Sequence, residues 1–439
     1  MIQRPKGTAD IFLEEMEIWQ YVEETARIFM HDYRFTEIRT PLFESFDLFS
    51  RSVGDTSDIV SKEMYDFLDK GERRIALKPE GTAPIARAYV ENKLFGPEFP
   101  NPLKVYYLSP MFRYERPQSG RSRQFHQLGV EVIGSTNPAV DVESMALIWD
   151  FLSELGVEDL KLVINSLGKT EERVKFRAAL IAYLEPFYEE LSKDSQKRLH
   201  NNPLRVLDSK DKRDKEIVKD APNVLEFLSD ESREHFESVQ KLLTELDIPF
   251  TIDNKMVRGL DYYQDTIFEI VSTSDVFSSE TTICGGGRYD GLIEEIGGPS
   301  KPGFGFGLGL ERLILMLKKQ KVDIPEMSHL DVYIVGIGEE TNTMTLKIAQ
   351  AVRHAGFSAD RDFMNRKPKA QFKTADKNNA KVVLTIGSSE LENQEAKFKV
   401  MKTGKEITVS FNDIFNDFER IYNTQTADMT AFDDFFTKE

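Results

Sequence analysis

Hydrophobic and polar residues along the first 168 positions follow both helical and strand periods, so this part of the chain is predicted to mix the two kinds of element. A helix is predicted over residues 14–30. A second helix is predicted to begin near Thr82, a suitable N-cap that precedes Pro84 in the first turn. An extended segment over residues 35–40 stops at Pro41, in keeping with the extended bias of residues that precede proline.

Two later stretches, residues 105–113 and 125–133, are predicted to be strands that pair through a turn around residues 118–120. Successive side chains of a strand point to opposite faces, so the second strand has an apolar face and a polar face. The apolar face carries Leu128, Val130 and Val132, and the polar face carries Gln127, Gly129 and Glu131.

Pairing of these strands places Arg113 with Gln127 and Glu131 around one cavity, where Gly129 leaves room for a ligand. The alternative is an exposed antiparallel hairpin whose polar face is solvated.

The rest of the chain divides into further stretches by the character of its residues. Residues 169–246 are charged and helical in period, which predicts a helical insertion. Strand signals return over residues 247–320, with two glycine-rich segments and an apolar helix. Residues 330–423 alternate strand, helix and strand, which predicts a small α/β domain with a parallel sheet. Residues 424–439 are polar, acidic and expected to form a flexible tail. The fold class is therefore predicted to be α+β.

Length and composition fit a globular protein of two or three domains, with 439 residues of which 40% are hydrophobic and 30% charged. The chain has no apolar run of about 18 residues, and its N-terminus lacks the apolar centre of a signal peptide. With 1 cysteine it cannot form an internal disulfide. We therefore expect a cytoplasmic protein without membrane spans. A net charge of -17 argues against a general nucleic-acid coat. Residues 361–381 nevertheless carry seven basic and two acidic side chains, and this local excess of +5 makes them the candidate for contact with a polyanion.

Charged residues are concentrated in residues 112–134, which read FRYERPQSGRSRQFHQLGVEVIG. It places four arginines around Glu115, namely Arg113, Arg116, Arg121 and Arg123. Arginines this close repel one another unless an anion lies among them, and their planar forks donate bidentate hydrogen bonds to phosphate. We therefore predict a polyphosphate ligand, and for Arg123 a structural salt bridge.

Three further segments are candidates for the same site. Residues 258–263, RGLDYY, precede a strand, and adjacent tyrosines of an extended chain face opposite ways, so one tyrosine is predicted to line the cavity. The alternative is an aromatic core pair with a salt-bridged arginine. The glycine runs at residues 284–291 and 303–312 permit close approach of a ligand, although many such runs are only loops. Neither run matches a phosphate loop or a dinucleotide fingerprint.

The remaining reactive residues indicate neither a nucleophile nor a metal site. Cys284 stands beside the glycines, where a buried small thiol is the more common situation. The 6 histidines are scattered without ligand spacing, so no protein-bound metal is predicted.

Together these segments resemble class II aminoacyl-tRNA synthetases, and within that class the histidyl-tRNA synthetase family, of bacterial length and layout. IRTPLFE around Pro41, the arginine-rich stretch and GFGLGLERL at residues 305–313 resemble motifs 1, 2 and 3 of the class. RGLDYY and GGGRYDGL, at residues 258–263 and 285–292, resemble two histidine-specific signatures, and LKPEGTAPIAR at residues 77–87 matches as well. The resemblance covers nearly the whole chain, least in the insertion and the tail.

This resemblance implies a class II synthetase catalytic domain with an antiparallel sheet, at residues 1–168 and 247–320, interrupted by the helical insertion at 169–246. A small α/β anticodon-binding domain at 330–423 follows. Motif 1 implies a homodimer. The implied enzyme is a ligase that uses ATP to join L-histidine to the 3′ end of tRNA(His) through histidyl-adenylate, with Mg²⁺ bound mainly through the ATP phosphates.

The same resemblance implies which residues bind histidine. Glu80 and Thr82, with Gln127, would hold the substrate ammonium group. Glu131 and Tyr263 would bind opposite imidazole nitrogens, and Tyr262 belongs to the same pocket. A site built on such hydrogen bonds rejects apolar analogues strongly.

The resemblance also implies which residues bind ATP, and among them two catalytic arginines. Arg258 would lie at the carboxylate of histidine and the α-phosphate of ATP, and Arg113 would hold the same phosphate from the other side. Arg312 would bind the γ-phosphate and Arg121 the distal phosphates. Phe125 would stack on adenine, whose amino group Glu115 would bind. Arg116 and Gln118 would face the acceptor end of the tRNA.

The main alternative is a regulatory paralogue that has lost catalysis and serves a histidine-biosynthetic phosphoribosyltransferase. Such paralogues typically lack the C-terminal domain and have eroded signatures, whereas RGLDYY and Arg113 are present here. Synthetases for threonine, proline or glycine share motifs 1 to 3 but not GGGRYDGL together with Glu131.

Overall fold

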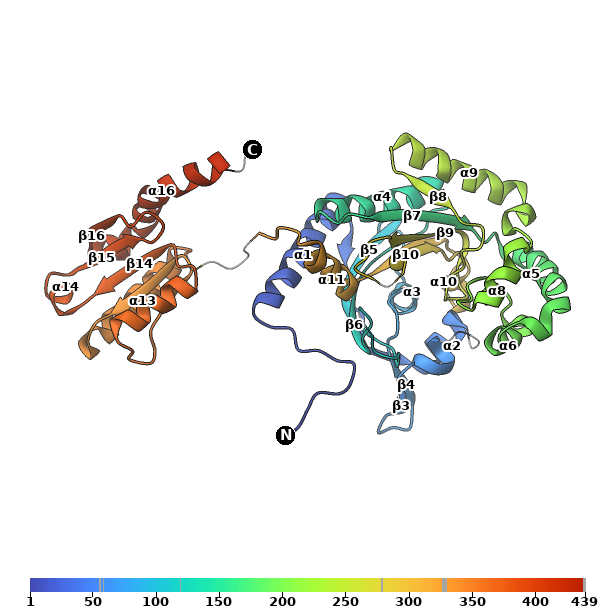
Figure 1. The fold of residues 1–439 in the computed structure, drawn as a ribbon, viewed down its shortest axis with the longest axis horizontal. Coiled ribbons are helices and arrows are strands. Elements are labelled where there is room, and N and C mark those ends of the chain that lie inside the picture. The colour runs from blue at the N-terminus through green and yellow to red at the C-terminus, as the bar shows by residue number, and fades with distance from the viewer. Residues whose placement is uncertain (55–56, 58, 119, 278, 326–329, 437–439) are drawn as a thin grey trace. The chain divides into compact units, whose positions relative to one another are not determined.

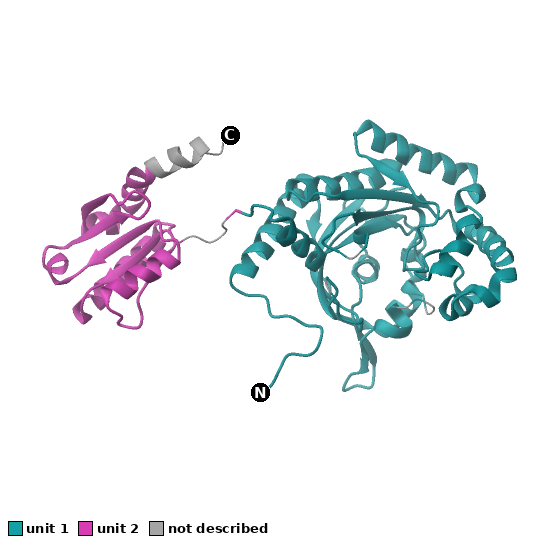
Figure 2. Ribbon diagram, viewed as in Figure 1, with its two compact units in different colours: residues 1–324 teal, residues 325–439 magenta. Residues whose placement is uncertain are grey.

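The computed structural model describes residues 1–54, 57, 59–118, 120–277, 279–325 and 330–436, with side chains as far as residue 427. It consists of two compact units, Met1–Ile324 and Pro325–Glu439, drawn in teal and magenta in Figure 2. Ser119 of the predicted turn and residues 437–439 of the predicted tail lie outside the described residues.

An 8-stranded sheet forms the centre of the first unit (Figure 1). Its strands, in spatial order, are β1 (Thr36–Glu37), β5 (Leu103–Phe112), β6 (Gln124–Ile133), β11 (Gly303–Gly309), β10 (Thr281–Arg288), β9 (Gln264–Ser272), β7 (Leu160–Ser166) and β8 (Phe250–Ile252). All pairings among the central strands are antiparallel, as predicted. The short edge strands β1 and β8 are parallel to their neighbours.

Helices cover both faces of this sheet. One face packs against α1 (Glu14–Asp32), α4 (Pro138–Glu154) and α11 (Leu310–Gln320), in a core that includes Leu128, Val130 and Val132. The other face packs against α2 (Phe46–Val53), α3 (Thr82–Glu91) and α10 (Leu292–Glu295). The predicted apolar face of β6 is therefore confirmed. Glu131 on the opposite face is fully buried, so the alternative of a solvated hairpin is wrong.

The first turn of α3 differs from the prediction. The helix begins at Thr82, but its N-cap is Gly81, and the Thr82 side chain makes no capping hydrogen bond. The carboxylate of Glu80 accepts hydrogen bonds from the backbone N–H groups of Thr82 and Ala83, both at 2.8 Å. Because Glu80 satisfies these first-turn donors, the Thr82 hydroxyl is left for another partner.

The helical insertion is confirmed and has its own small core around Phe176 and Leu180. Its elements are α5 (Thr170–Leu184), η2 (Glu185–Glu190), α6 (Lys193–Asn201), α7 (Leu204–Leu207), α8 (Lys212–Ile217), η3 (Val218–Asp220), η4 (Val224–Phe227) and α9 (Asp230–Glu245). A separate 3-stranded sheet, β2 (Phe43–Ser45), β4 (Arg74–Leu77) and β3 (Asp66–Leu68), and the short helix η1 (Ile59–Glu63) complete the first unit.

The second unit is a 5-stranded sheet with helices. The strands, in spatial order, are β13 (Ala359–Arg361), β12 (Val332–Gly336), β14 (Val382–Ile386), β15 (Glu395–Val400) and β16 (Glu406–Ser410). The helices are η5 (Glu339–Thr341), α12 (Asn342–His354), α13 (Pro368–Lys377), α14 (Ser388–Glu392), α15 (Phe411–Asn416) and α16 (Phe418–Phe436).

The predicted parallel sheet of this unit is correct only in part. Strands β13, β12 and β14 are parallel, whereas β15 and β16 join as an antiparallel extension. Helix α16 continues through most of the predicted tail, whose flexibility stays a prediction. None of the described helices is long and apolar enough to cross a membrane.

Candidate active site

Glycines of three adjacent strands form the floor of the candidate site. On one face of the sheet Gly307 of β11 pairs with Gly129 of β6 on one side and with Gly285 of β10 on the other. Side chains lie flat against this floor, because a Cβ added to Gly305 would lie 1.9 Å from the carboxylate of Glu131. The glycine runs are thus strands that permit close approach of other groups, and the alternative that they are only loops is wrong.

Tyr107 occupies the space that we expected a ligand to take above Gly129. The two residues face each other across β5 and β6. A Cβ on Gly129 would lie 2.2 Å from the Tyr107 ring, so the glycine makes room for a tyrosine and the prediction is wrong. Tyr107 is 5% exposed, and burial, followed by the nearby Glu131 and Glu80 carboxylates, raises its pKa well above the ordinary value. Tyr107 had no predicted role, because its place opposite Gly129 depends on the register of the two strands.

Glu131 lies at the centre of the polar face and receives two hydroxyl donors. Thr82 donates to one carboxylate oxygen at 2.7 Å, and Tyr289 donates to the other at 2.5 Å. Tyr289 follows β10 and is 1% exposed. It was not assigned a role from the sequence, although it lies inside the GGGRYDGL signature.

Glu131 and Glu80 form a buried cluster with Thr82, Tyr262 and Tyr289, which we call the pocket. The two carboxyl groups lack an ionic partner among the described residues. Burial raises the pKa of Glu131 to about 8, despite the hydrogen bonds from Thr82 and Tyr289. Burial also raises the pKa of Glu80, although its backbone donors and the more distant Arg113 act in the opposite direction. A ligand that brings positive charge or N–H donors would offset the cost of this burial.

The raised pKa of Glu131 gives a pH-dependent stability. The folded protein binds this proton more tightly than the unfolded chain does, so the contribution is present at low pH and is lost as pH rises through about 8. In the absence of ligand, we expect the free energy of unfolding to fall between pH 6 and 9 less steeply in Glu131→Gln than in the wild-type chain. Urea unfolding of both proteins across this range is the measurement, and identical slopes would contradict the burial argument.

The two tyrosines of RGLDYY lie together rather than on opposite faces. Their ring centroids are 4.7 Å apart, and both rings are buried in the same cluster. The segment forms a turn before β9, so the alternation of an extended strand does not apply. The Tyr262 hydroxyl donates to Glu80 at 3.3 Å, which brings it to the same pocket as Glu131.

Arg258 approaches the floor from the same segment. A Cβ on Gly285 would lie 2.4 Å from its guanidinium, which also pairs with Glu269 of β9 and lies 5.4 Å from the centre of the Tyr263 ring. Two buried polar atoms here, Nε of Arg258 and Oε1 of Gln127, have no hydrogen-bond partner among the described residues. Buried polar atoms are rarely left unpaired, so each of these two atoms has hydrogen-bonding capacity that the described residues do not use.

A second group of guanidinium ions lies next to the pocket. Arg113 donates through Nε to the carbonyl of Pro79 at 2.8 Å, one residue before Glu80. Burial lowers the pKa of Arg312, and repulsion from Arg121 and Arg113 lowers it further. Glu115 lies 3.2 Å from Arg121 and 4.0 Å from Arg113, and it offsets only part of this positive charge. The arrangement is compatible with an anion of several charges, and the polyphosphate ligand stays a prediction.

The turn between β5 and β6 carries the remaining predicted residues. Gln118 and Arg121 form an isolated β-bridge, and Arg116 and Gln118 are exposed. Phe125 lies 5.3 Å from the Arg113 guanidinium. Arg123 stacks 3.8 Å over the ring of Tyr114 and donates to a backbone carbonyl, so its contacts are structural but differ from the expected salt bridge.

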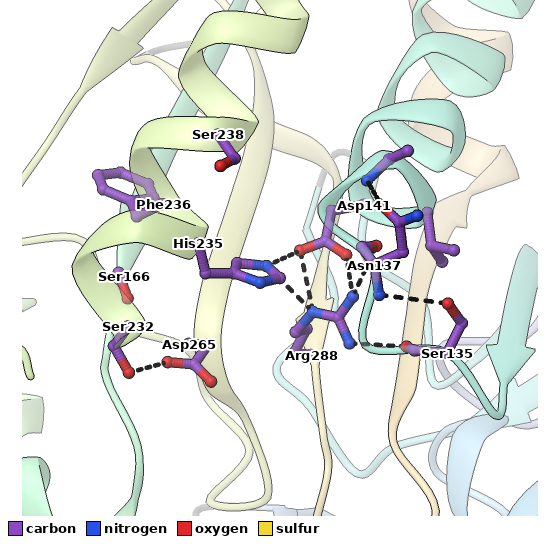
Figure 3. Close-up of polar contacts among 12 residues, drawn as sticks. Ser135, Asn137, Asp141, Ser166, Ser232, His235, Phe236, Ser238, Asp265 and Arg288 are labelled. Atoms are coloured by element: carbon purple, nitrogen blue, oxygen red, sulfur yellow. Dashed lines mark hydrogen bonds and ion pairs between the residues drawn. The ribbon is translucent and has the colours of Figure 1, made fainter. Parts of the chain in front are cut away.

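Figure 3 shows Arg288 of GGGRYDGL in a buried polar network with Ser135, Asn137 and Asp141. Its guanidinium binds the carboxylate of Asp141 on α4 at 2.5 Å and the carbonyls of Ser135 and Asn137 at 3.0 and 3.2 Å. His235 of α9 lies 2.9 Å from the same carboxylate. The network connects the end of β10, just before Tyr289, to α4 and to the insertion.

Cys284 is 1% exposed, and burial raises the pKa of its thiol, so the inert buried thiol is the better interpretation. Within the described part of the chain, no group of three or more His, Cys, Asp or Glu side chains could hold a metal ion. The acidic side chains that oppose the lowering of the Arg312 pKa are Glu115 and Glu269, and Glu269 is itself paired with Arg258.

Comparison with known proteins agrees with this arrangement. The antiparallel sheet with its helical insertion, followed by the second unit, is the architecture of a class II aminoacyl-tRNA synthetase with an anticodon-binding domain. The family profile for histidyl-tRNA synthetase matches residues 7–313, and the profile for an anticodon binding domain matches residues 331–420. The chain belongs to the histidyl-tRNA synthetase family.

Individual relatives extend over nearly the whole chain. A histidine–tRNA ligase of Ligilactobacillus salivarius is 58% identical over 417 residues, which are 95% of this chain and 97% of that protein. The crystal structure of histidyl-tRNA synthetase from S. aureus is 41% identical with a TM-score of 0.81, covering 94% of this chain and 99% of that one. A structure from Bacillus halodurans described as an ATP phosphoribosyltransferase regulatory subunit/histidyl-tRNA synthetase is 20% identical with a TM-score of 0.64, covering 88% and 99%, and it shares the fold alone.

Proposed function

We propose that this protein is a histidine–tRNA ligase that uses ATP to attach L-histidine to the 3′ end of tRNA(His) through histidyl-adenylate. The observation that carries the proposal is the pocket in which two buried carboxylates without ionic partners, Glu80 and Glu131, adjoin the cluster of Arg113, Arg121 and Arg312. The carboxylates suit the cationic and N–H groups of histidine, and the arginines suit a polyphosphate.

In the histidine pocket, Glu80, Thr82 and Gln127 hold the α-ammonium group. Glu131 and Tyr263 bind opposite nitrogens of the imidazole, with Tyr262 beside them. The unpaired Oε1 of Gln127 and the two carboxylates supply acceptors for N–H groups. The buried hydroxyl of Tyr289 keeps the Glu131 carboxylate in place.

Adenylation needs positioning and neutralisation of charge more than covalent help from the protein. A carboxylate oxygen of histidine attacks the α-phosphorus, the bond to the bridging oxygen breaks, and pyrophosphate leaves. Arg258 and Arg113 bind the α-phosphate from two sides. Arg312 binds the γ-phosphate, and Arg121 binds the distal phosphates.

The adenine ring has its own contacts: Phe125 stacks on it, and Glu115 binds its amino group. Mg²⁺, held mainly by the phosphates, neutralises part of their charge.

In the second step, the 3′-hydroxyl oxygen of the tRNA attacks the carbonyl carbon of the adenylate, and AMP leaves. Arg116 and Gln118 contact the acceptor end, which their exposure on the turn before β6 permits. The second unit binds the anticodon, in agreement with the matched profile and the local charge of residues 361–381.

Lysines of the basic segment are expected to bind tRNA phosphates. Lys367, Lys369 and Lys373 lie exposed at and after the start of α13 and form no ion pair with described residues, whereas Arg366 is paired with Asp362. Changing all three to glutamine should weaken tRNA charging. In a plot of log KM for tRNA against log salt concentration, the slope should decrease by about one for each phosphate that the variant no longer binds. ATP–pyrophosphate exchange should be unchanged.

The matched control changes three exposed lysines elsewhere in the same unit, Lys347, Lys402 and Lys405, to glutamine and so alters the net charge equally. This variant should charge tRNA normally. Equal losses of charging and exchange in the first variant, or equal losses in both variants, would show that the segment is not a specific tRNA contact.

We further propose a homodimer that acts in the cytoplasm. Large apolar side chains are exposed on and beside the 3-stranded sheet near motif 1, namely Leu42, Phe43, Phe67 and Leu68. A cluster of this kind on a surface favours burial against a partner, here a second copy of the chain.

The regulatory-paralogue alternative is not favoured, because the family profile, the anticodon domain and the residues of the pocket are all present. Charging of a tRNA(His) transcript with labelled histidine, in the presence of ATP and Mg²⁺, tests the proposed reaction. We expect acid-precipitable histidine that depends on both ATP and tRNA. Pure, folded protein that yields none would support the paralogue.

A further inference from the structure

The histidine-signature segment, residues 258–263, has no regular secondary structure and depends on other parts of the chain for its shape. It supplies Arg258, Tyr262 and Tyr263 to the pocket. Just after it, Asp265 has a φ of 43°, in the left-handed region that a non-glycine residue adopts at a cost. A loop of this kind keeps one conformation only where its surroundings hold it.

The helical insertion provides part of this support. Arg173 of α5 donates through one guanidinium nitrogen to the carbonyl of Tyr263 at 2.6 Å and to that of Asp261 at 3.3 Å. The amide of Asn202, after α6, donates to the side chain of Asp261 at 3.1 Å. The peptide groups before Tyr262 and after Tyr263 are therefore tied to the insertion.

A second contact from the insertion holds the end of the same segment. Ser232 of α9 donates to Asp265 at 2.8 Å, as Figure 3 shows. One turn further along α9, His235 contacts the network of Asp141 and Arg288 that ends beside Tyr289. Both signature segments of the histidine pocket are thus held by helices of the insertion.

We propose that Arg173 is a positioning residue for histidine recognition, acting through the backbone carbonyls of Asp261 and Tyr263. It fixes the orientation of the two tyrosines and of Arg258 without touching substrate. The insertion then has a function in binding the amino acid as well as any contact with tRNA. This inference rests on the proposed ligase function. It predicts a higher KM for histidine and, through Arg258, a slower adenylation step, with little change in KM for ATP, because Arg113 and Arg312 come from other segments.

The test is Arg173→Gln in histidine-dependent ATP–pyrophosphate exchange. A small displacement of binding groups has large kinetic effects, so KM for histidine should rise about tenfold or more, while KM for ATP changes less than about twofold. Arg173→Lys keeps the charge but not the guanidinium and should show a smaller change in the same direction.

The chain offers a matched control on the same helix. Arg177 of α5 also donates to two backbone carbonyls, those of His200 and Asn201, but both lie inside the insertion. Arg177→Gln should leave both KM values unchanged. Circular dichroism verifies folding. If Arg173→Gln does not fold, Asn202→Ala, which removes only the bond to Asp261, is the substitute and should raise KM for histidine alone.

An unchanged KM for histidine in folded Arg173→Gln, or equal changes in KM for histidine and ATP, would overturn the inference and leave the ligase function untouched. Equal effects in Arg173→Gln and Arg177→Gln would likewise reduce Arg173 to a general stabiliser of the insertion. Failure of the wild-type protein to show histidine-dependent exchange would instead reject the proposed function itself.

Discussion

Replacement of Arg258 by alanine is expected to lower histidine-dependent ATP–pyrophosphate exchange on the order of a hundredfold or more, the usual cost of removing one preorganised donor to developing charge. The guanidinium has an unpaired buried Nε and lies over Gly285 on the floor of the pocket. Exchange kinetics at saturating histidine and ATP measure the loss.

A lysine variant separates charge from geometry in this experiment. Arg258→Lys keeps a positive charge beside Glu269 but loses the planar guanidinium. Its exchange rate should therefore lie between those of Arg258→Ala and the wild type. Thermal unfolding should verify that the alanine variant folds, since Glu269 loses its ionic partner. Exchange close to that of the wild type in Arg258→Ala would remove this residue from the proposed mechanism.

Replacement of Gly305 by alanine should disable the histidine pocket. The added Cβ would lie 1.9 Å from the Glu131 carboxylate and 2.5 Å from the backbone carbonyl of Val130, and a carbonyl in a central strand has little freedom to move. Overpacking costs about 1–3 kcal/mol, and here it displaces a proposed imidazole ligand, so KM for histidine should rise about tenfold or more.

Gly309 provides the matched control, because it lies on the same face at the end of the same strand and a Cβ there meets nothing within 4 Å. Gly309→Ala should retain near-normal exchange. Urea unfolding and KM for histidine should be measured for both variants. If Gly305→Ala binds histidine as well as Gly309→Ala does, the close contact between Gly305 and Glu131 has no role in recognition.

The strand pattern around Glu131 could be predicted from sequence because alternation has a simple physical basis. Leu128, Val130 and Val132 had to share one face, and burial of that face leaves the Glu131 face for the pocket. The antiparallel pairing of β5 and β6 followed from the short connection between them. The strand positions of Gln127 and Glu131 follow from this geometry, whereas the cavity that they were expected to share with Arg113 stays a prediction.

Features that depend on contacts between distant segments could not be predicted in the same way. Tyr107 fills the space above Gly129 because of the strand register. At the start of α3, the backbone N–H groups bind the Glu80 carboxylate and not the Thr82 hydroxyl, because that carboxylate reaches the helix. Tyr262 and Tyr263 lie together because their segment turns before β9. Tyr289 was missed because nothing local to GGGRYDGL indicates a distant partner such as Glu131.

ATP–pyrophosphate exchange by the pure protein, measured with each of the twenty amino acids in turn, tests the central claim most directly. A pocket built from buried hydrogen-bonding groups discriminates by several orders of magnitude against substrates that leave those groups unpaired. We predict exchange with histidine and almost none with the other nineteen. No exchange with histidine, or equal exchange with another amino acid, would contradict the proposed function.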